Sequence, residues 1–207
     1  WLDRTQINTS NSINIGRFLP QITYYAYHSW RWFIEAGQVA QWVVPAGNLG
    51  NATAAYVAQS IGIPMGAIVM SSNANRVMAD YLDAGQYEPR QSMATLANAM
   101  DVGAPSNIER LQALFGDFSS LNQAVDVVVA TDEMISQTIQ AAYREHHALL
   151  CPHTATAVYA RSFLNAQPWL VAATAAPCKF EQVVEPLLGI DVPAEGALCA
   201  QLARPSY

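Results

Sequence analysis

Charged residues, and basic ones above all, are scarce in this sequence of 207 residues. They make up 13% of it, and its ten lysines and arginines leave a formal net charge of −6. The basic residues are scattered singly, whereas binding to a nucleic-acid backbone needs a basic face. The composition therefore excludes a nucleic-acid-binding protein and favours work on a small molecule. A hydrophobic fraction of 52% also excludes a disordered chain and predicts a sizeable core.

Cysteine is rare and long apolar runs are absent. The three cysteines are Cys151, Cys178 and Cys199. An odd number without CxxC spacing predicts neither a full disulfide framework nor a metal site, so we expect a reducing, cytoplasmic setting. The nearest approach to a membrane span of about 18 apolar residues is residues 13–32, which contain Arg17, His28 and Arg31. We expect no membrane partner, and the first twelve residues lack the pattern of a secretory signal.

Strands and helices are expected to alternate along the chain. Apolar runs and turn residues predict strands at 41–45, 66–71, 124–130 and 169–173, and helices at 52–61, 73–84, 105–115, 131–146, 154–164 and 179–188. Thr131 is expected to cap the helix that follows it, because Asp132 and Glu133 occupy its first turn. This alternation predicts an α/β fold with a mainly parallel sheet and helices on both faces.

The chain is expected to begin with a long core helix over residues 12–36, capped by Asn11 or Ser12 and ended by Gly37. No strand precedes it, which is unusual for a self-contained doubly wound domain. We expect one α/β domain over residues 1–189 and a surface tail over residues 190–207, where apolar periodicity is weak.

A glycine loop at residues 47–51 joins a predicted buried strand to a predicted helix. Such a loop aims backbone N–H groups at the positive end of a helix, where a phosphate binds without basic side chains. We expect Gly47 and Gly50 to adopt positive φ and to admit a ligand closely, and Asn48 and Asn51 to donate hydrogen bonds or cap the helix. The alternative is a tight turn without a ligand.

Three further residues have both a chemical and a structural interpretation. Thr174 follows the last predicted strand, where ligands of open α/β sheets bind, but it could cap a turn. His153 begins a predicted helix and could face a site or cap backbone groups. Lys179 is the chain's one lysine, and an ordinary surface position is the simpler interpretation of it.

Five segments, in this order and spacing, resemble the carboxy-terminal half of the threonine synthase family. They are NSINIGRFLPQITYY (11–25), VPAGNLGNATAAYVAQSIGIP (44–64), TLANAMDVGAPSNIERL (95–111), CPHTATAVY (151–159) and ATAAPCKFEQVVEPLLG (173–189). The resemblance implies a partial chain of a fold type II enzyme, similar to tryptophan synthase β, that uses pyridoxal 5′-phosphate. It further implies conversion of O-phospho-L-homoserine and water to L-threonine and phosphate, the final step of threonine biosynthesis.

The resemblance also implies roles for individual residues. The cofactor phosphate would be held by Gly47, Asn48, Leu49, Gly50 and Asn51. Thr174 would lie at the pyridine nitrogen, and Asn14 and Arg17 would bind substrate. The Schiff-base lysine of the family lies upstream, so this chain would contain no catalytic residue and Lys179 would not be that lysine. The missing amino-terminal half is therefore the expected partner, and the chain alone is expected to be inactive.

Two departures from the family pattern bear on these roles. Asn51 stands where the family often has Asp, and the family's TAHPAKF is TAAPCKF here, with Ala176 in place of histidine. Two alternatives stay open: a serine or threonine dehydratase-like enzyme with the same cofactor, and a non-catalytic phosphate-binding or interaction module. The NSIN and AMDxxxPSNxER segments favour the synthase, whereas the absent lysine favours the module.

Overall fold

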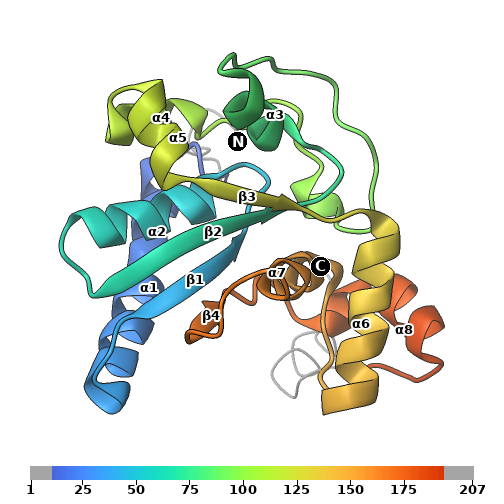
Figure 1. Ribbon diagram of the computed structural model, residues 1–207. Helices are drawn as coiled ribbons and strands as arrows, with labels where there is room; N and C mark the ends of the chain where they lie inside the picture. The colour runs from blue at the N-terminus through green and yellow to red at the C-terminus, as the bar shows by residue number, and fades with distance from the viewer. Residues whose placement is uncertain (1–10, 194–207) are drawn as a thin grey trace, which may run out of the picture.

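A computed structural model describes residues 11–193, which form a parallel sheet layered between helices (Figure 1). The elements are α1 (Ile15–Ala36), β1 (Ala40–Pro45), α2 (Gly50–Ser60), β2 (Met65–Ser72), α3 (Val77–Ala84), the 3-10 helix η2 (Asn98–Met100), α4 (Ile108–Phe115), α5 (Phe118–Ala124), β3 (Asp126–Val129), α6 (Asp132–His146), α7 (Pro152–Arg161), β4 (Trp169–Val171), the 3-10 helix η3 (Pro177–Phe180) and α8 (Glu181–Leu188).

The four described strands are all parallel, in the order β3-β2-β1-β4. At the centre, Val43 of β1 pairs with Val69 on one side and Val171 on the other. Every residue of β1 is buried, which explains why this strand is apolar apart from Gln41 and does not alternate between polar and apolar residues. The predicted parallel α/β fold is confirmed.

Helices cover both faces of the sheet, because successive side chains of β1 point in opposite directions. Trp42 and Val44 pack in the core with α1 and α2, whereas Val43 packs against Ala157 and Ala160 of α7. Figure 1 shows α1 and α2 on one side of the sheet and α7, backed by α6 and α8, on the other. All carboxyl ends of the strands therefore open at one edge, between the two helical layers.

Helix α1 differs from the predicted core helix. Its cap is Asn14, whose Oδ1 accepts the Gly16 amide at 2.9 Å, rather than Asn11 or Ser12. Gly37 ends it in the left-handed conformation at φ 68°, as expected. Its buried residues are Phe18, Tyr25 and Ser29 alone, so one narrow stripe faces the core and the prediction of a core helix is wrong. The polar residues Arg17, Gln21, His28, Arg31 and Glu35 share one side of this amphipathic helix, and the buried stripe is only part of its apolar side.

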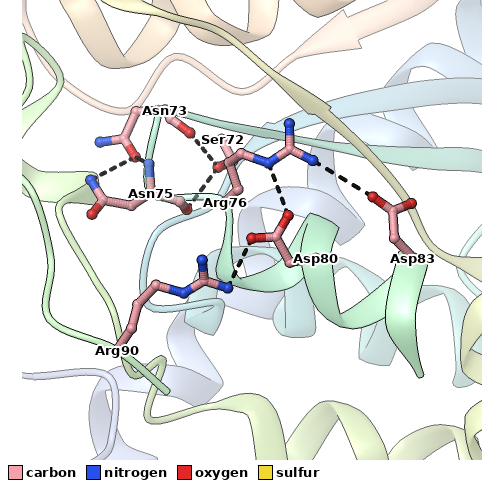
Figure 2. A network of polar contacts seen from close by, with 7 residues as sticks. All are labelled: Ser72, Asn73, Asn75, Arg76, Asp80, Asp83 and Arg90. Atoms are coloured by element: carbon pink, nitrogen blue, oxygen red, sulfur yellow. Dashed lines mark hydrogen bonds and ion pairs between the residues drawn. The ribbon is translucent and has the colours of Figure 1, made fainter. Parts of the chain in front are cut away.

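Elsewhere the element types are as predicted, with shifted ends. Thr131 caps α6, its Oγ1 accepting the Met134 amide at 3.4 Å, which confirms that boundary. Helix α3 starts four residues later than expected, because Asn73 and Asn75 form a hydrogen-bonded loop after β2 (Figure 2). The same view shows Asp80 of α3 between two arginines, Arg76 and Arg90. The short helix α5 was not predicted, and the last predicted helix is divided into η3 and α8.

The predicted tail is described only at its start. Val192 is buried in a core cluster, and its amide donates to Glu185 Oε1 at 2.9 Å. Residues 194–207 lie outside the described part of the chain, so the boundary at 189 stays a prediction. Among residues 11–193, no helix is both long and apolar enough to cross a membrane.

Candidate functional site

A cavity of about 900 Å³ opens at the carboxyl edge of the sheet, beside the ends of β1 and β4. This volume lies in the range of small-molecule sites, and the carboxyl edge is where open α/β sheets bind ligands. Its lining residues are Gly16, Arg17, Pro20, Gln21, Tyr24, His28, Trp42, Pro45, Gly47, Asn51, Ala99, Met100, His153, Leu170, Val171, Ala172, Ala173 and Thr174.

The glycine loop brings the amino end of α2 to this cavity. The Thr53 amide donates to the Leu49 carbonyl at 2.8 Å, the first bond of the helical pattern. In an α-helix the amides before that one have no intrahelical acceptor. They give the loop the donors and the positive dipole end that an anion requires.

Positive φ in this loop belongs to Leu49, at 59°, and not to Gly47 or Gly50. The expectation that the two glycines adopt positive φ is therefore wrong. Leu49 is 1% exposed, and burial of its side chain in the main core offsets the strain of a left-handed leucine. Nothing in the sequence distinguishes a residue that is held in this way by tertiary packing.

The glycines are needed instead for close approach of other segments. A Cβ atom on Gly47 would lie 2.6 Å from Met100 Cα, and one on Gly50 would lie 2.6 Å from the Cβ and Oγ atoms of Ser12. Real Cβ contacts of this length essentially do not occur. Each glycine thus gives room to the backbone or side chain of a different segment, 95–111 for Gly47 and 11–25 for Gly50.

Asn48 is occupied by protein partners and does not line the cavity. Its Oδ1 accepts the Ser106 amide at 2.6 Å and the Ser106 hydroxyl at 2.9 Å. Its Nδ2 donates to Asn11 and Ser12. Asn107, which is fully buried, donates from Nδ2 to the Asn48 carbonyl at 2.8 Å and to Ser12 Oγ at 2.9 Å. These bonds fasten the loop to two other segments.

Asn51 lies in the cavity wall with its side chain held by α1. Its Oδ1 accepts hydrogen bonds from the hydroxyls of Tyr24 and Tyr25, the second at 2.7 Å. Its Nδ2 donates to the Pro45 carbonyl at 3.3 Å. Burial raises the pKa of both tyrosines, so both stay protonated donors at neutral pH. An amide accepts these hydroxyls without the burial of a charge, which a carboxylate here would bring.

The two predicted substrate residues occupy different positions. Arg17 lies one turn into α1 and lines the cavity, whereas Asn14 caps that helix outside the lining. No aspartate or glutamate is among the described lining residues, whereas Arg17 supplies a positive charge there. Although the whole chain is acidic, the cavity itself is therefore suited to an anionic ligand.

Thr174 lines the cavity just beyond β4, the strand that pairs with β1, after which the glycine loop begins. Lys179 lies in η3, is exposed, and is absent from the lining. Ala176, at the family's histidine position, precedes η3 and is also absent from it. Of the predicted site residues, the structure thus brings together Arg17, Gly47, Asn51 and Thr174 in the lining.

His153 belongs to this site, although the sequence did not assign it there. It is 3% exposed, lies in the first turn of α7, and accepts the Ala99 amide on Nε2 at 3.0 Å. The signal available from sequence was its place in the CPHTATA segment. With it, each of the five segments quoted above contributes to the cavity lining.

Curated threonine synthases resemble nearly the whole chain in sequence. No family model matches it. Escherichia coli threonine synthase is 36% identical over an alignment 212 residues long, which covers 97% of this chain and 48% of that protein. Haemophilus influenzae threonine synthase is 35% identical over 194 residues, 90% of this chain and 44% of that protein. The chain thus spans about half the length of the curated relatives it matches.

Some solved structures share only the fold of this chain, at low sequence identity. Maize serine racemase and a fungal L-serine ammonia-lyase, at TM-scores of 0.53 and 0.60 and identities of 13% and 14%, share the fold alone. They cover 88% and 76% of this chain, and 52% and 51% of their own chains are matched. The chain accordingly has part of the fold of the type II pyridoxal-phosphate enzymes.

Within that class the similarity to one family is much higher. Escherichia coli threonine synthase superposes at a TM-score of 0.83 with 33% identity, over 96% of this chain and 46% of that structure. A structure of Brucella melitensis threonine synthase with pyridoxal phosphate bound gives 0.84 with 27% identity, over 97% and 48%. In both sequence and structure, the chain matches the carboxy-terminal half of threonine synthases.

Proposed function

We propose that the intact protein containing this chain converts O-phospho-L-homoserine and water to L-threonine and phosphate with pyridoxal 5′-phosphate. One observation carries the proposal: the five segments that resemble threonine synthase all contribute to one cavity with basic and no acidic lining. A shared ancestry of sequence alone would not require these segments to converge on a single site. A functional site that is built from all five segments does require them to converge.

The residues present fit this cofactor. The amino end of α2 would hold its phosphate through backbone amides of residues 47–51, and Thr174 would lie at the ring nitrogen. When bound, pyridoxal phosphate supplies an electron sink that delocalises carbanion charge beside the amine of a substrate. Apolar walls at Trp42 and Leu170 would exclude water from the ring.

Arg17 and Asn14 have separate tasks in this proposal. Arg17 would bind the phosphate or carboxylate of the substrate, because its planar guanidinium can donate two hydrogen bonds to either group. Asn14 would act through the backbone, since its side chain fixes the first turn of α1 and so places Arg17. The lysine that moves protons in the reaction would lie upstream of this chain.

The partner proposed for the chain is the amino-terminal half of the same protein. More than half of the exposed large hydrophobic residues in the described part of the chain lie on α1: Ile15, Leu19, Tyr24, Tyr27, Trp30, Phe33 and Ile34. We call this set the α1 face. It adjoins the cavity through Tyr24, and contiguous exposed apolar surface of this kind marks an interaction site. We also place the protein in the cytoplasm, on the strength of two free thiols, Cys151 and Cys178.

The test is an assay of the intact, cofactor-loaded protein for threonine and phosphate formed from O-phosphohomoserine. We expect both products in equal amounts. Arg17→Gln should raise KM for this substrate, and Arg31→Gln, on the same helix but in an exposed ion pair with Glu35, should behave as the wild type. Deamination of threonine without reaction of O-phosphohomoserine would assign the protein to the dehydratases. Cofactor binding without either reaction would support a non-catalytic module.

A further inference from the structure

His153 connects two elements of the cavity that are far apart in sequence. It begins α7, and its Nε2 accepts the amide hydrogen of Ala99, 54 positions earlier, at 3.0 Å. The ring packs against Phe180 of η3 with 4.6 Å between centroids. A histidine held on both sides in this way has one orientation, and Nε2 is aimed at a backbone donor.

This hydrogen bond fixes the protonation state of the ring. Because Nε2 accepts, it carries no proton, so the neutral ring is protonated on Nδ1. Nδ1 is buried and has no hydrogen-bond partner among the described residues. A second proton would turn Nε2 into a donor facing the Ala99 donor, and the bond would be lost.

The turn that His153 holds is the one that packs on the glycine loop. Ala99 and Met100 both line the cavity, and Met100 Cα lies where Gly47 has no side chain, 2.6 Å from an added Cβ atom. The start and end of this turn are fixed separately, because Asp101 accepts hydrogen bonds from the Thr95 amide and hydroxyl. The side chain of His153 therefore anchors the turn at the point where it meets the loop.

The surroundings favour the neutral ring. Burial lowers the pKa of His153, and the carboxylate of Asp101 opposes this without cancelling it. The positive end of α7 also disfavours an imidazolium in its first turn. Of the other titratable groups nearby, Arg17 and His28 share the cavity, Cys151 caps α7, and Lys179 lies in η3 next to Phe180.

We propose that His153 is a positioning residue that holds the Ala99–Met100 turn against the glycine loop, and that it does so only as the neutral imidazole. The contact itself is independent of the ligand. Its consequence for cofactor binding rests on the proposed function, because the glycine loop is the proposed phosphate site. The turn should be released at acid pH, below the ordinary histidine pKa of about 6.5.

The experiment is hydrogen exchange at the Ala99 amide of the intact protein, expressed as protection relative to the intrinsic rate at each pH. In the wild type, protection at pH 7.5 should fall about tenfold at pH 5, the size expected for one lost hydrogen bond. His153→Gln keeps an acceptor that does not titrate, so its protection should persist at both pH values. His153→Leu has no acceptor and should be unprotected at both.

Two controls separate this effect from others. His146→Gln changes an exposed histidine at the end of α6 and should keep the wild-type pH dependence. The Gln variant of His153 retains Asp101, so acid release through that carboxyl would persist in it. Equal protection in wild type and His153→Leu, or acid release in His153→Gln, would overturn the proposal. If the Leu variant does not fold, the comparison of wild type with Gln still decides.

Cofactor affinity gives a second measurement. Titration with pyridoxal phosphate at pH 7.5 should show a dissociation constant about tenfold higher for His153→Leu, with wild-type affinity in His153→Gln. Unchanged affinity in the Leu variant, despite loss of Ala99 protection, would contradict the link to the glycine loop. A wild-type protein that binds no pyridoxal phosphate would refute the proposed function, whereas the exchange measurement would still test the role of His153.

Discussion

In the glycine loop, Leu49 adopts the positive φ, and Gly47 allows the close approach of another segment. The left-handed conformation falls on Leu49, whose buried side chain compensates for it, while Gly47 is required because Met100 lies directly against its Cα atom. Glycine was predictable at this place from the need for close approach. Which segment approaches, and which residue carries the strain, follow from tertiary contacts that a local pattern does not encode.

Gly47→Ala should destabilise the protein by about 1–3 kcal/mol, because the added methyl group overpacks a backbone contact. It should also weaken pyridoxal-phosphate binding by moving the amino end of α2. Thermal unfolding and cofactor titration of the intact protein measure the two effects. Gly116→Ala is the matched control: it has φ 82° and open space around it, so it should lose stability through strain alone. Equal loss of affinity in both variants would show that the contact with Met100 is irrelevant to the site.

Asn107 explains why an asparagine occurs inside the PSNxER motif. It is fully buried, and besides donating to Ser12 and to the Asn48 carbonyl, it accepts a hydrogen bond from Arg110 on Oδ1 at 2.5 Å. Asn107→Ala should cost about 2 kcal/mol, because Ser12, the Asn48 carbonyl and Arg110 all lose a partner inside the protein. The same change at Asn98, which is exposed, should be nearly neutral. A thermal midpoint of Asn107→Ala equal to that of Asn98→Ala would contradict this account.

Among the secondary-structure elements, those with local signals were predicted best. Helix α6 has a cap, acidic residues in its first turn and basic ones in its last, all read from neighbouring positions. Helix α1 was harder, since its apolar side is wide and only packing decides which stripe of that side is buried. Its cap was also misplaced, because Asn11, Ser12 and Asn14 are equally good candidates by residue type.

Thr131→Ala should lower the stability of the protein by about 1 kcal/mol, the usual effect of removing a helix cap. Thr138→Ala provides the matched change within the same helix, where its hydroxyl donates to the Met134 carbonyl. That substitution should be neutral or slightly stabilising, because alanine has the higher helix propensity. Thermal unfolding measures the stability of both variants. A larger loss of stability in Thr138→Ala than in Thr131→Ala would show that the cap does not stabilise the helix.

At the scale of the whole molecule, the parallel sheet explains why distant segments meet. Parallel strands place their carboxyl ends at one edge, so the loops after β1 and β4 become neighbours despite more than a hundred intervening residues. The order of strands and helices predicted that edge and the glycine loop. The contributions of Ala99, Met100 and His153 could not be predicted in the same way, because they come from an irregular segment and from α7, placed by long-range contacts.

The cavity has walls from both helical layers, yet it contains no lysine from the described chain. Lys179, the one lysine of the sequence, is exposed in η3 and does not line it. The α1 face beside the cavity lacks cover in the described structure. Residues 1–207 alone should therefore not turn over O-phosphohomoserine, and they should self-associate through the α1 face.

Mixing residues 1–207 with pyridoxal phosphate, reducing with borohydride and mapping by mass spectrometry tests whether any lysine reacts specifically. Because Lys179 is an exposed amine without a bound ring beside it, we expect a low yield that rises with cofactor concentration and never saturates. Lys179→Arg keeps the charge in η3 and removes the amine, so any remaining adduct reports the chain's amino terminus. A stoichiometric adduct at Lys179, together with threonine formation that Lys179→Arg abolishes, would show that this half of the protein is an enzyme by itself.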